Sequence, residues 1–170
     1  VYLFTQSGDT WSQQAYIKAS NAALFDQFSR GGVALSSDGS VLAVGAIGEG
    51  SSATGINGDQ TNNSASNSGA VYLFTQSSGT WSQQAYIKAS NTEEDDQFGS
   101  SLTLSPNGRI LAVAANEEDG QATGINGDPT DNSLTDSGAV YVFAQSEGVW
   151  SQQSYVKASN AGALDTLGLS

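Results

Sequence analysis

Residues 71–87 read VYLFTQSSGTWSQQAYI, two runs of apolar and polar side chains that flank Ser78 and Gly79. Enrichment in β-branched and aromatic residues, with alternation, is typical of half-buried strands. Gly79 supplies the positive φ that a tight turn requires. The stretch therefore predicts a β-hairpin.

This hairpin sequence occurs three times in the 170 residues. The copies begin at Val1, Val71 and Val140, which gives spacings of 70 and 69 residues. The Trp-Ser-Gln-Gln string inside each copy begins at Trp11, Trp81 and Trp150. A fixed period of this size indicates a tandem array of structural units.

Each unit contains two further strand-like runs, near 100–105 and 110–115 in the second copy. They are joined by Ser-Pro-Asn-Gly at 105–108, which corresponds to Ser-Ser-Asp-Gly at 36–39 and indicates a second hairpin. A polar loop of about 20 residues, 49–69 or 118–138, precedes the runs at 70–76 or 139–145 and at 81–89. The sequence predicts an all-β fold of four-stranded antiparallel sheets, the unit of a β-propeller blade.

Two short motifs resemble the FG-GAP repeat, the blade of the integrin-type β-propeller. Phe98-Gly99 matches the first half of the family signature, and Gly45-Ala46 matches two-thirds of the second. The copies depart from it in places: Ser29 follows Phe28, Leu167-Gly168 replaces Phe-Gly, Ile47 stands where the family has Pro, and 114–116 read Ala-Ala-Asn. The resemblance implies an extracellular, non-catalytic propeller that presents loops to protein or glycan partners.

The blade boundaries follow if each blade begins at its Phe-Gly position. Residues 1–20 are expected to form the second half of one blade, 27–90 and 97–159 two complete blades, and 160–170 the start of another. Closed propellers need about four to eight blades. We therefore expect these residues, which begin without Met or a signal peptide, to be a window on a longer array. In the alternative, open edges serve assembly.

Composition excludes several kinds of chemistry. The chain has no Cys and no His, which excludes disulfides, thiolate nucleophiles, Ser-His triads and imidazole metal sites. The net charge of −12 disfavours nucleic acid and anionic membrane surfaces. No apolar run approaches the roughly 20 residues of a membrane span. We expect no nucleic-acid partner and no membrane insertion, and any bound cation to use oxygen ligands.

The long loops contain candidate calcium ligands at alternate positions. These are Asn57, Asp59, Thr61 and Asn63 in one loop, and Asn126, Asp128, Thr130 and Asn132 in the other. Alternate spacing is how an EF-hand loop presents its first ligands, although no Glu closes the set here. The same residues also suit a loop held by Asx turns, so both interpretations stay open. The turns at 36–40 and 105–109 lack the Asp-rich calcium loop that the family often carries.

Other polar residues favour structural roles. Asp26, Asp96 and Asp165 each precede the start of a blade, and a residue copied in every unit is expected to accept backbone N–H groups and not to catalyse. The acidic runs at 93–96 and 117–119 are interpreted as solvated rims that could add calcium ligands in the second copy. The tryptophans are expected to pack between blades, with Trp81 on the strand face of Ala85. Asn62 begins an N-glycosylation sequon.

The sequence thus predicts an extracellular or cell-surface binding or adhesion module that recognises protein or glycan ligands through its long loops, and no enzyme. The alternative is a structural subunit of an extracellular filament or surface assembly. Further copies of the chain would then be its partners, through repeat stacking or strand exchange.

Overall fold

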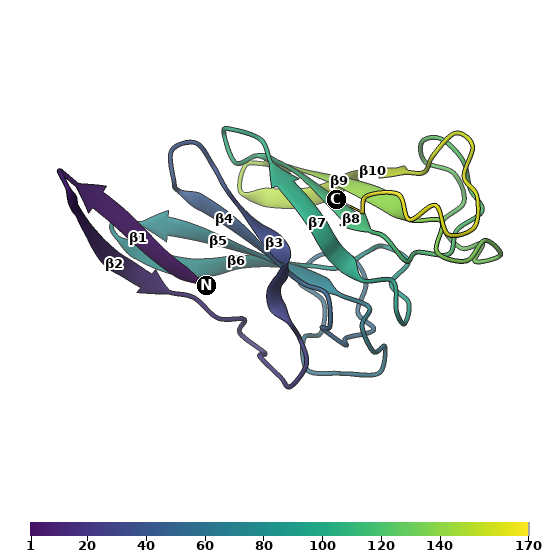
Figure 1. The fold of residues 1–170 in the computed structure, drawn as a ribbon, viewed down its shortest axis with the longest axis horizontal. Coiled ribbons are helices and arrows are strands. Elements are labelled where there is room, and N and C mark those ends of the chain that lie inside the picture. The colour runs from purple at the N-terminus through teal and green to yellow at the C-terminus, as the bar shows by residue number, and fades with distance from the viewer. Residues whose placement is uncertain (170) are drawn as a thin grey trace.

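The computed structural model describes residues 1–169, which form ten strands in three antiparallel sheets (Figure 1). The first sheet pairs β1 (Tyr2–Ser7) with β2 (Thr10–Tyr16). The second contains β3 (Phe28–Leu35), β4 (Val41–Ala46), β5 (Ala70–Ser77) and β6 (Thr80–Ile87) in that order. The third contains β7 (Phe98–Leu104), β8 (Ile110–Ala115), β9 (Ala139–Ser146) and β10 (Val149–Val156).

The predicted all-β class and the four-stranded units are confirmed. Residues 1–169 contain no helix, and the paired strands of each sheet are antiparallel. Ser78 and Gly79 take φ values of 50° and 82°, so both central residues of the β5–β6 turn are left-handed. None of the described residues form a helix long and apolar enough to cross a membrane.

Each sheet packs face to face on the next, and Figure 1 shows β1–β2 and β7–β10 at opposite ends of the row. Successive side chains of a strand point to opposite faces. In β5, Tyr72 faces β1–β2 and Leu73 faces β7–β10, and both are completely buried. The central sheet therefore contributes to two hydrophobic cores.

The strands have two ends with different roles. At one end, which we call the turn end, lie the tight turns at 8–9, 36–40, 78–79, 105–109 and 147–148. At the other, the loop end, lie the long loops 47–69 and 116–138 and the segments 17–27, 88–97 and 157–169 that follow each sheet. The candidate site lies at the loop end.

One prediction about β6 is wrong. Trp81 does not share a core with Ala85 and Ile87; it packs with the cluster of Tyr72 and Tyr86. The pairing of β5 with β6 shifts register between Leu73 and Phe74, which inserts an extra residue into β6. A β-bulge of this kind reverses which face each later side chain occupies.

The expectation that tryptophans pack between sheets is confirmed for Trp150. Its side chain is only 7% exposed and belongs to the core between the second and third sheets. Trp81 is partly buried, and Trp11 on the first sheet is exposed. The three tryptophans thus have different environments. Trp150 lies between two four-stranded sheets, whereas the sheet that faces Trp81 has two strands and no sheet within residues 1–169 faces Trp11.

The second and third sheets approach closely at Gly31. A Cβ atom at this position would lie 1.7 Å from the carbonyl oxygen of Gly99 in β7. Only glycine allows such an approach of one backbone to another. The contact brings β3 and β7, the first strands of the two complete sheets, together.

Candidate functional site at the loop end

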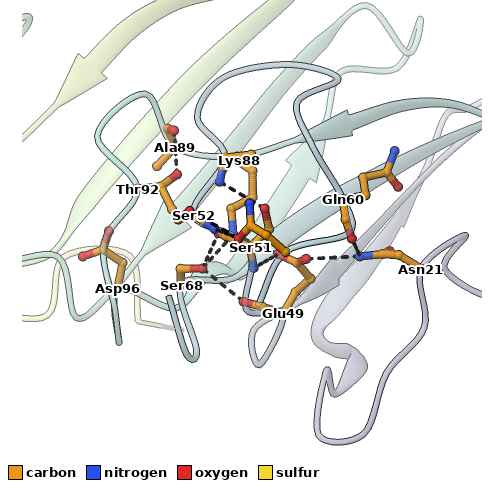
Figure 2. Close-up of polar contacts among 12 residues, drawn as sticks. Asn21, Glu49, Ser51, Ser52, Gln60, Ser68, Lys88, Ala89, Thr92 and Asp96 are labelled. Atoms are coloured by element: carbon orange, nitrogen blue, oxygen red, sulfur yellow. Dashed lines mark hydrogen bonds and ion pairs between the residues drawn. The ribbon is translucent and has the colours of Figure 1, made fainter. Parts of the chain in front are cut away.

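A buried ion pair supports the loop end of each complete sheet. Lys88 follows β6, and its Nζ lies 2.9 Å from Oε2 of Glu49, which follows β4 (Figure 2). The third sheet repeats the pair with Lys157 and Glu118 at 2.5 Å. The side chains of both pairs are at most 1% exposed.

Hydrogen bonds complete the shell of the first pair. The Lys88 ammonium donates to Oγ of Ser68 at 2.7 Å, and the backbone N–H of Ser51 donates to Glu49 at 3.2 Å. Burial lowers the pKa of Lys88, and the adjacent Glu49 acts in the opposite direction. Removal of one partner would leave the other charge buried and uncompensated, which is strongly destabilising.

Asn21 ties the preceding sheet to this pair. It lies in the segment between β2 and β3, and its Nδ2 donates to Glu49 Oε1 at 3.2 Å and to the carbonyl of Gln60 at 3.0 Å. Its Oδ1 accepts the hydroxyl of Tyr72 at 2.6 Å. The equivalent Asn91 makes the same three contacts, with Glu118, Pro129 and Tyr141. Each segment between sheets is thereby fixed to the long loop of the next sheet.

The three repeated aspartates accept backbone N–H groups, as predicted. Asp26 accepts from Ala23 at 2.6 Å, and the same contact recurs between Asp96 and Glu93 at 2.8 Å. Asp165 accepts from Gly162 at 2.7 Å. Burial raises the pKa of Asp96 to about 7, although the N–H of Glu93 acts in the opposite direction. These carboxylates shape the turns that lead into the next strand.

The interpretation of both acidic runs as solvated rims is wrong for two of their members. Asp96 and Glu118 are buried, at 5% and 1% exposure. Asp96 faces inward because it closes a turn on the Glu93 N–H, and Glu118 because it is the partner of Lys157. A run of like charges does not show which of its members has a buried partner.

The candidate calcium residues are placed as follows in the first long loop. Asn57 has a φ of 58°, and its Oδ1 accepts the N–H of Tyr86 in β6 at 3.0 Å. Asp59 Oδ1 accepts both the backbone N–H and the hydroxyl of Thr61, at 2.8 and 2.7 Å. Asn63 lies beside Gly50. The Asx turn at Asp59 is confirmed, and calcium binding stays a prediction.

The second long loop repeats this arrangement. Asn126 Oδ1 accepts the N–H of Tyr155 at 3.0 Å, and Asp128 Oδ1 accepts the N–H of Thr130 at 2.9 Å. Asn132 is exposed. Across residues 1–169, no three carboxylates come together as a metal-binding group. Calcium at either loop would therefore depend on one carboxylate with amide, hydroxyl and backbone oxygens.

The sequon residue Asn62 is half-buried within its loop. Its Oδ1 accepts the N–H of Ser52 at 2.9 Å and the hydroxyl of Ser64 at 3.2 Å. Asn62 thus closes the long loop on itself. Its modification stays a prediction.

A hollow of about 570 Å³ opens at the loop end beside the second sheet. It lies between the segment that precedes β3 and the long loop, and its lining includes Leu24, Phe25, Asn63, Ser66 and Asn67. Leu24 and Phe25 are 87% and 84% exposed. Phe25 also has a φ of 71°, which is rare for an aromatic residue. The lining of the hollow thus combines exposed apolar side chains, Leu24 and Phe25, with polar side chains of the long loop.

Sequence reasoning missed the ion pairs and the asparagine links. A signal was present, because three of the five basic residues are Lys18, Lys88 and Lys157 at one position of the repeat. Each follows the apolar end of a strand, where the fold buries Lys88 and Lys157 against a glutamate and leaves Lys18 exposed. Of the glutamate partners, Glu118 stands between Glu117 and Asp119, and Glu49 stands alone between two glycines, so no local pattern identifies either as the partner of a lysine.

Stacked four-stranded antiparallel sheets with close glycine contacts define the class of β-propeller blade arrays. The FG-GAP repeat model matches residues 11–74 and 81–143, together more than half of the chain. The chain belongs to the FG-GAP repeat family. No curated protein matches it.

Proposed function

We propose that this chain is an extracellular, non-catalytic binding module that recognises a protein or glycan partner at its loop end. The observation that carries the proposal is the hollow beside Leu24 and Phe25. Its volume lies within the range of ligand sites in proteins. An exposed aromatic side chain next to a polar rim is the arrangement of a binding hot spot.

Hydrogen bonds hold the segment that carries the apolar side chains of this hollow. Asp26 fixes the turn that carries Leu24 and Phe25, and Asn21 ties the same segment to Glu49. A turn whose backbone is held by hydrogen bonds loses less conformational entropy when a partner binds. The loop end is therefore pre-organised for recognition.

Three features support the absence of catalysis and the extracellular location. The repeated aspartates accept backbone N–H groups in each unit, which is a structural role. The chain has few lysines and many Ser, Thr, Asn and Gly residues, a composition typical of surface proteins. FG-GAP repeats are typical of extracellular proteins and generally form binding modules.

The test compares Phe25→Ser and Leu24→Ser with Val149→Ser. Val149 is 70% exposed but lies at the turn end, so it is a matched control for the loss of a surface apolar group. We expect arrays of extracellular proteins and glycans to identify a ligand for the unmodified chain and the control, and both loop-end variants to lose it. Equal binding by all four proteins would contradict the proposal.

A second candidate function, a structural subunit, is favoured by the outer face of β1–β2. Tyr2, Phe4, Trp11 and Tyr16 are all more than half exposed on this face. Their counterparts in the central sheet are Tyr72, Phe74, Trp81 and Tyr86. There β1–β2 packs over these side chains. A further blade of the same polypeptide, or a second copy, would cover the exposed face in the same way.

Electron microscopy of the native material discriminates between the two functions. Fibres with a regular axial repeat would favour the structural subunit. Compact rings would favour the binding module, because closed propellers leave only their loop and turn ends accessible.

A further inference from the structure

Two apolar faces of the row of sheets have no sheet packed on them within residues 1–169. They lie at opposite ends of the row, on the outer side of β1–β2 and on the outer side of β7–β10 (Figure 1). We call the first the head face; its exposed side chains are Tyr2, Phe4, Trp11 and Tyr16. We call the second the tail face; its exposed or partly exposed side chains include Ile110, Ile125, Val140 and Val142.

The repeat shows what covers a face like the head face. In the third sheet its counterparts are at most 7% exposed; they are Tyr141, Phe143, Trp150 and Tyr155. These side chains share one core with Val71 and Leu73 of the second sheet. Side chains of the head-face type are therefore buried when a four-stranded sheet presents its aliphatic side to them.

The tail face has the chemistry of the surface that provides this cover. Its four side chains occupy the repeat positions of residues that form or flank the core between the second and third sheets, namely Val41, Ile56, Val71 and Leu73. Each replacement keeps an aliphatic side chain. The tail face therefore matches the surface that already buries Tyr141 and its neighbours.

The loop end of the tail face also has the geometry of this interface. Leu167 forms a parallel bridge with Gly138. The same bridge joins Phe98 to Gly69, where the third sheet packs on the second. The tail face is thus arranged to receive a further sheet.

One polar group beside the tail face lacks the partner that its counterparts have. Asn91 accepts the hydroxyl of Tyr141 in the next sheet at 2.7 Å, and the repeat before it has the same contact at 2.6 Å. Asn160 occupies the position of Asn91; it is exposed, and its side chain has no hydrogen bond within residues 1–169. On the head face, Tyr2 occupies the position of Tyr141.

We propose that the tail face of one copy of this chain binds the head face of a second copy, and that Tyr2 of the second copy donates its hydroxyl to Asn160 of the first. The contact is head to tail, so each copy keeps one face free and further copies can add. The inference rests on the second candidate function, the structural subunit, and names its partner and its interface.

Sedimentation velocity of the full chain over a range of protein concentrations tests this contact. A solution of about 1 M NaCl shortens the Debye length to about 3 Å, so the net charge of −12 does not hold the copies apart. Trp11→Asp alters the head face and Ile110→Asp the tail face. Both side chains are at least 50% exposed, so thermal melts should show folded variants. Leu24→Asp, at the loop end and 87% exposed, is the matched control.

We expect the unmodified chain and the control to associate as the concentration rises. Each face variant alone should weaken association by roughly 30-fold or more, the effect of a lost central contact. An equimolar mixture of the two face variants should recover one strong contact and stop at a dimer, because each variant supplies the face that the other lacks. If two head faces paired instead, Ile110→Asp would associate as the unmodified chain does.

Tyr2→Phe and Asn160→Ala test the hydrogen bond between copies. Each should weaken association by about two- to tenfold, the effect of one lost hydrogen bond. Both changes in one chain should weaken it no more than the larger single effect, because the two groups share one interaction. Additive losses would overturn the assignment of this pair.

A chain that stays monomeric would leave both faces to neighbouring repeats of a longer polypeptide and would overturn the inference. Unchanged association of Ile110→Asp, or a mixture that associates no better than its components, would also overturn it. Fibres in the native material together with any of these results would retain the structural subunit and reject only this interface. The measurement contains no ligand, so recognition at the loop end can fail separately.

Discussion

Lys88 and Glu49 form an ion pair that is completely shielded from solvent, 39 residues apart in sequence and 2.9 Å apart in space. We predict that Lys88→Met destabilises the chain by roughly 3–5 kcal/mol, because it leaves the Glu49 carboxylate buried without a cation. Urea unfolding measures the loss. The double variant Lys88→Met with Glu49→Leu should recover much of it, since it removes both charges.

Lys18 provides the control for this prediction. It occupies the same position of the repeat, but its side chain is exposed. Lys18→Met should change the free energy of unfolding by less than about 0.5 kcal/mol. A similar loss in both variants would show that burial of the pair does not explain the effect.

The sequence predicted the strands because their signals are local. Alternation in 71–77 and the turn at Ser78 and Gly79 specify a hairpin without any distant partner. The bulge in β6 could not be predicted in this way. It depends on how Leu73 and Ala85 pair across two strands, and a single inserted residue reverses the face of Trp81 relative to Ile87.

The candidate site was predicted less completely, because its contacts join residues far apart in sequence. The Asx turn at Asp59 spans two residues and was foreseen. The contact of Asn21 with Tyr72 spans 51 residues and joins two sheets, so no local pattern indicates it. Glu118 stands between Glu117 and Asp119, and Glu49 stands between two glycines, so only the fold shows that both are buried.

The raised pKa of Asp96 predicts a pH dependence of stability. Burial raises the pKa from an ordinary value near 4 to about 7, so in this interval the folded chain holds a proton that the unfolded chain releases. Stability should therefore fall as pH rises from about 4 to about 7, and then level off. Asp96→Asn keeps an acceptor for the Glu93 N–H and should remove this contribution.

Thermal melts between pH 4 and pH 8 measure the effect. The variant should be more stable than the unmodified chain at pH 7, by roughly 1–3 kcal/mol, and similar to it near pH 4. Asp9→Asn, in the exposed β1–β2 turn, makes the same change in charge and should leave the pH dependence unchanged. Parallel pH curves for Asp96→Asn and the unmodified chain would be inconsistent with this assignment.

The long loops allow a direct test of calcium. The Asx turn predicts that Asp59→Ala lowers the melting temperature by the same amount with and without Ca²⁺, because Thr61 loses its local acceptor in both cases. A bound ion would raise the melting temperature of the unmodified chain by mass action, and the variant would lose that gain. Asp128→Ala tests the second loop, and Asp9→Ala is the control for a lost surface charge.

The close approach of the second and third sheets predicts a large effect at Gly31. Its φ is not in the left-handed region, so alanine fits the backbone, but the new methyl group would lie 1.7 Å from the Gly99 carbonyl. Gly31→Ala must therefore push β3 away from β7 and open the core that contains Phe98 and Leu111. We expect a loss of roughly 3 kcal/mol or more in urea unfolding, at the upper end for overpacked sites.

Gly50→Ala is the matched control, because its added Cβ would meet only ordinary contacts at 3.6 Å or more. Its effect on the free energy of unfolding should stay below about 1 kcal/mol. A mild effect of Gly31→Ala would mean that the two sheets can separate at this point without loss of packing.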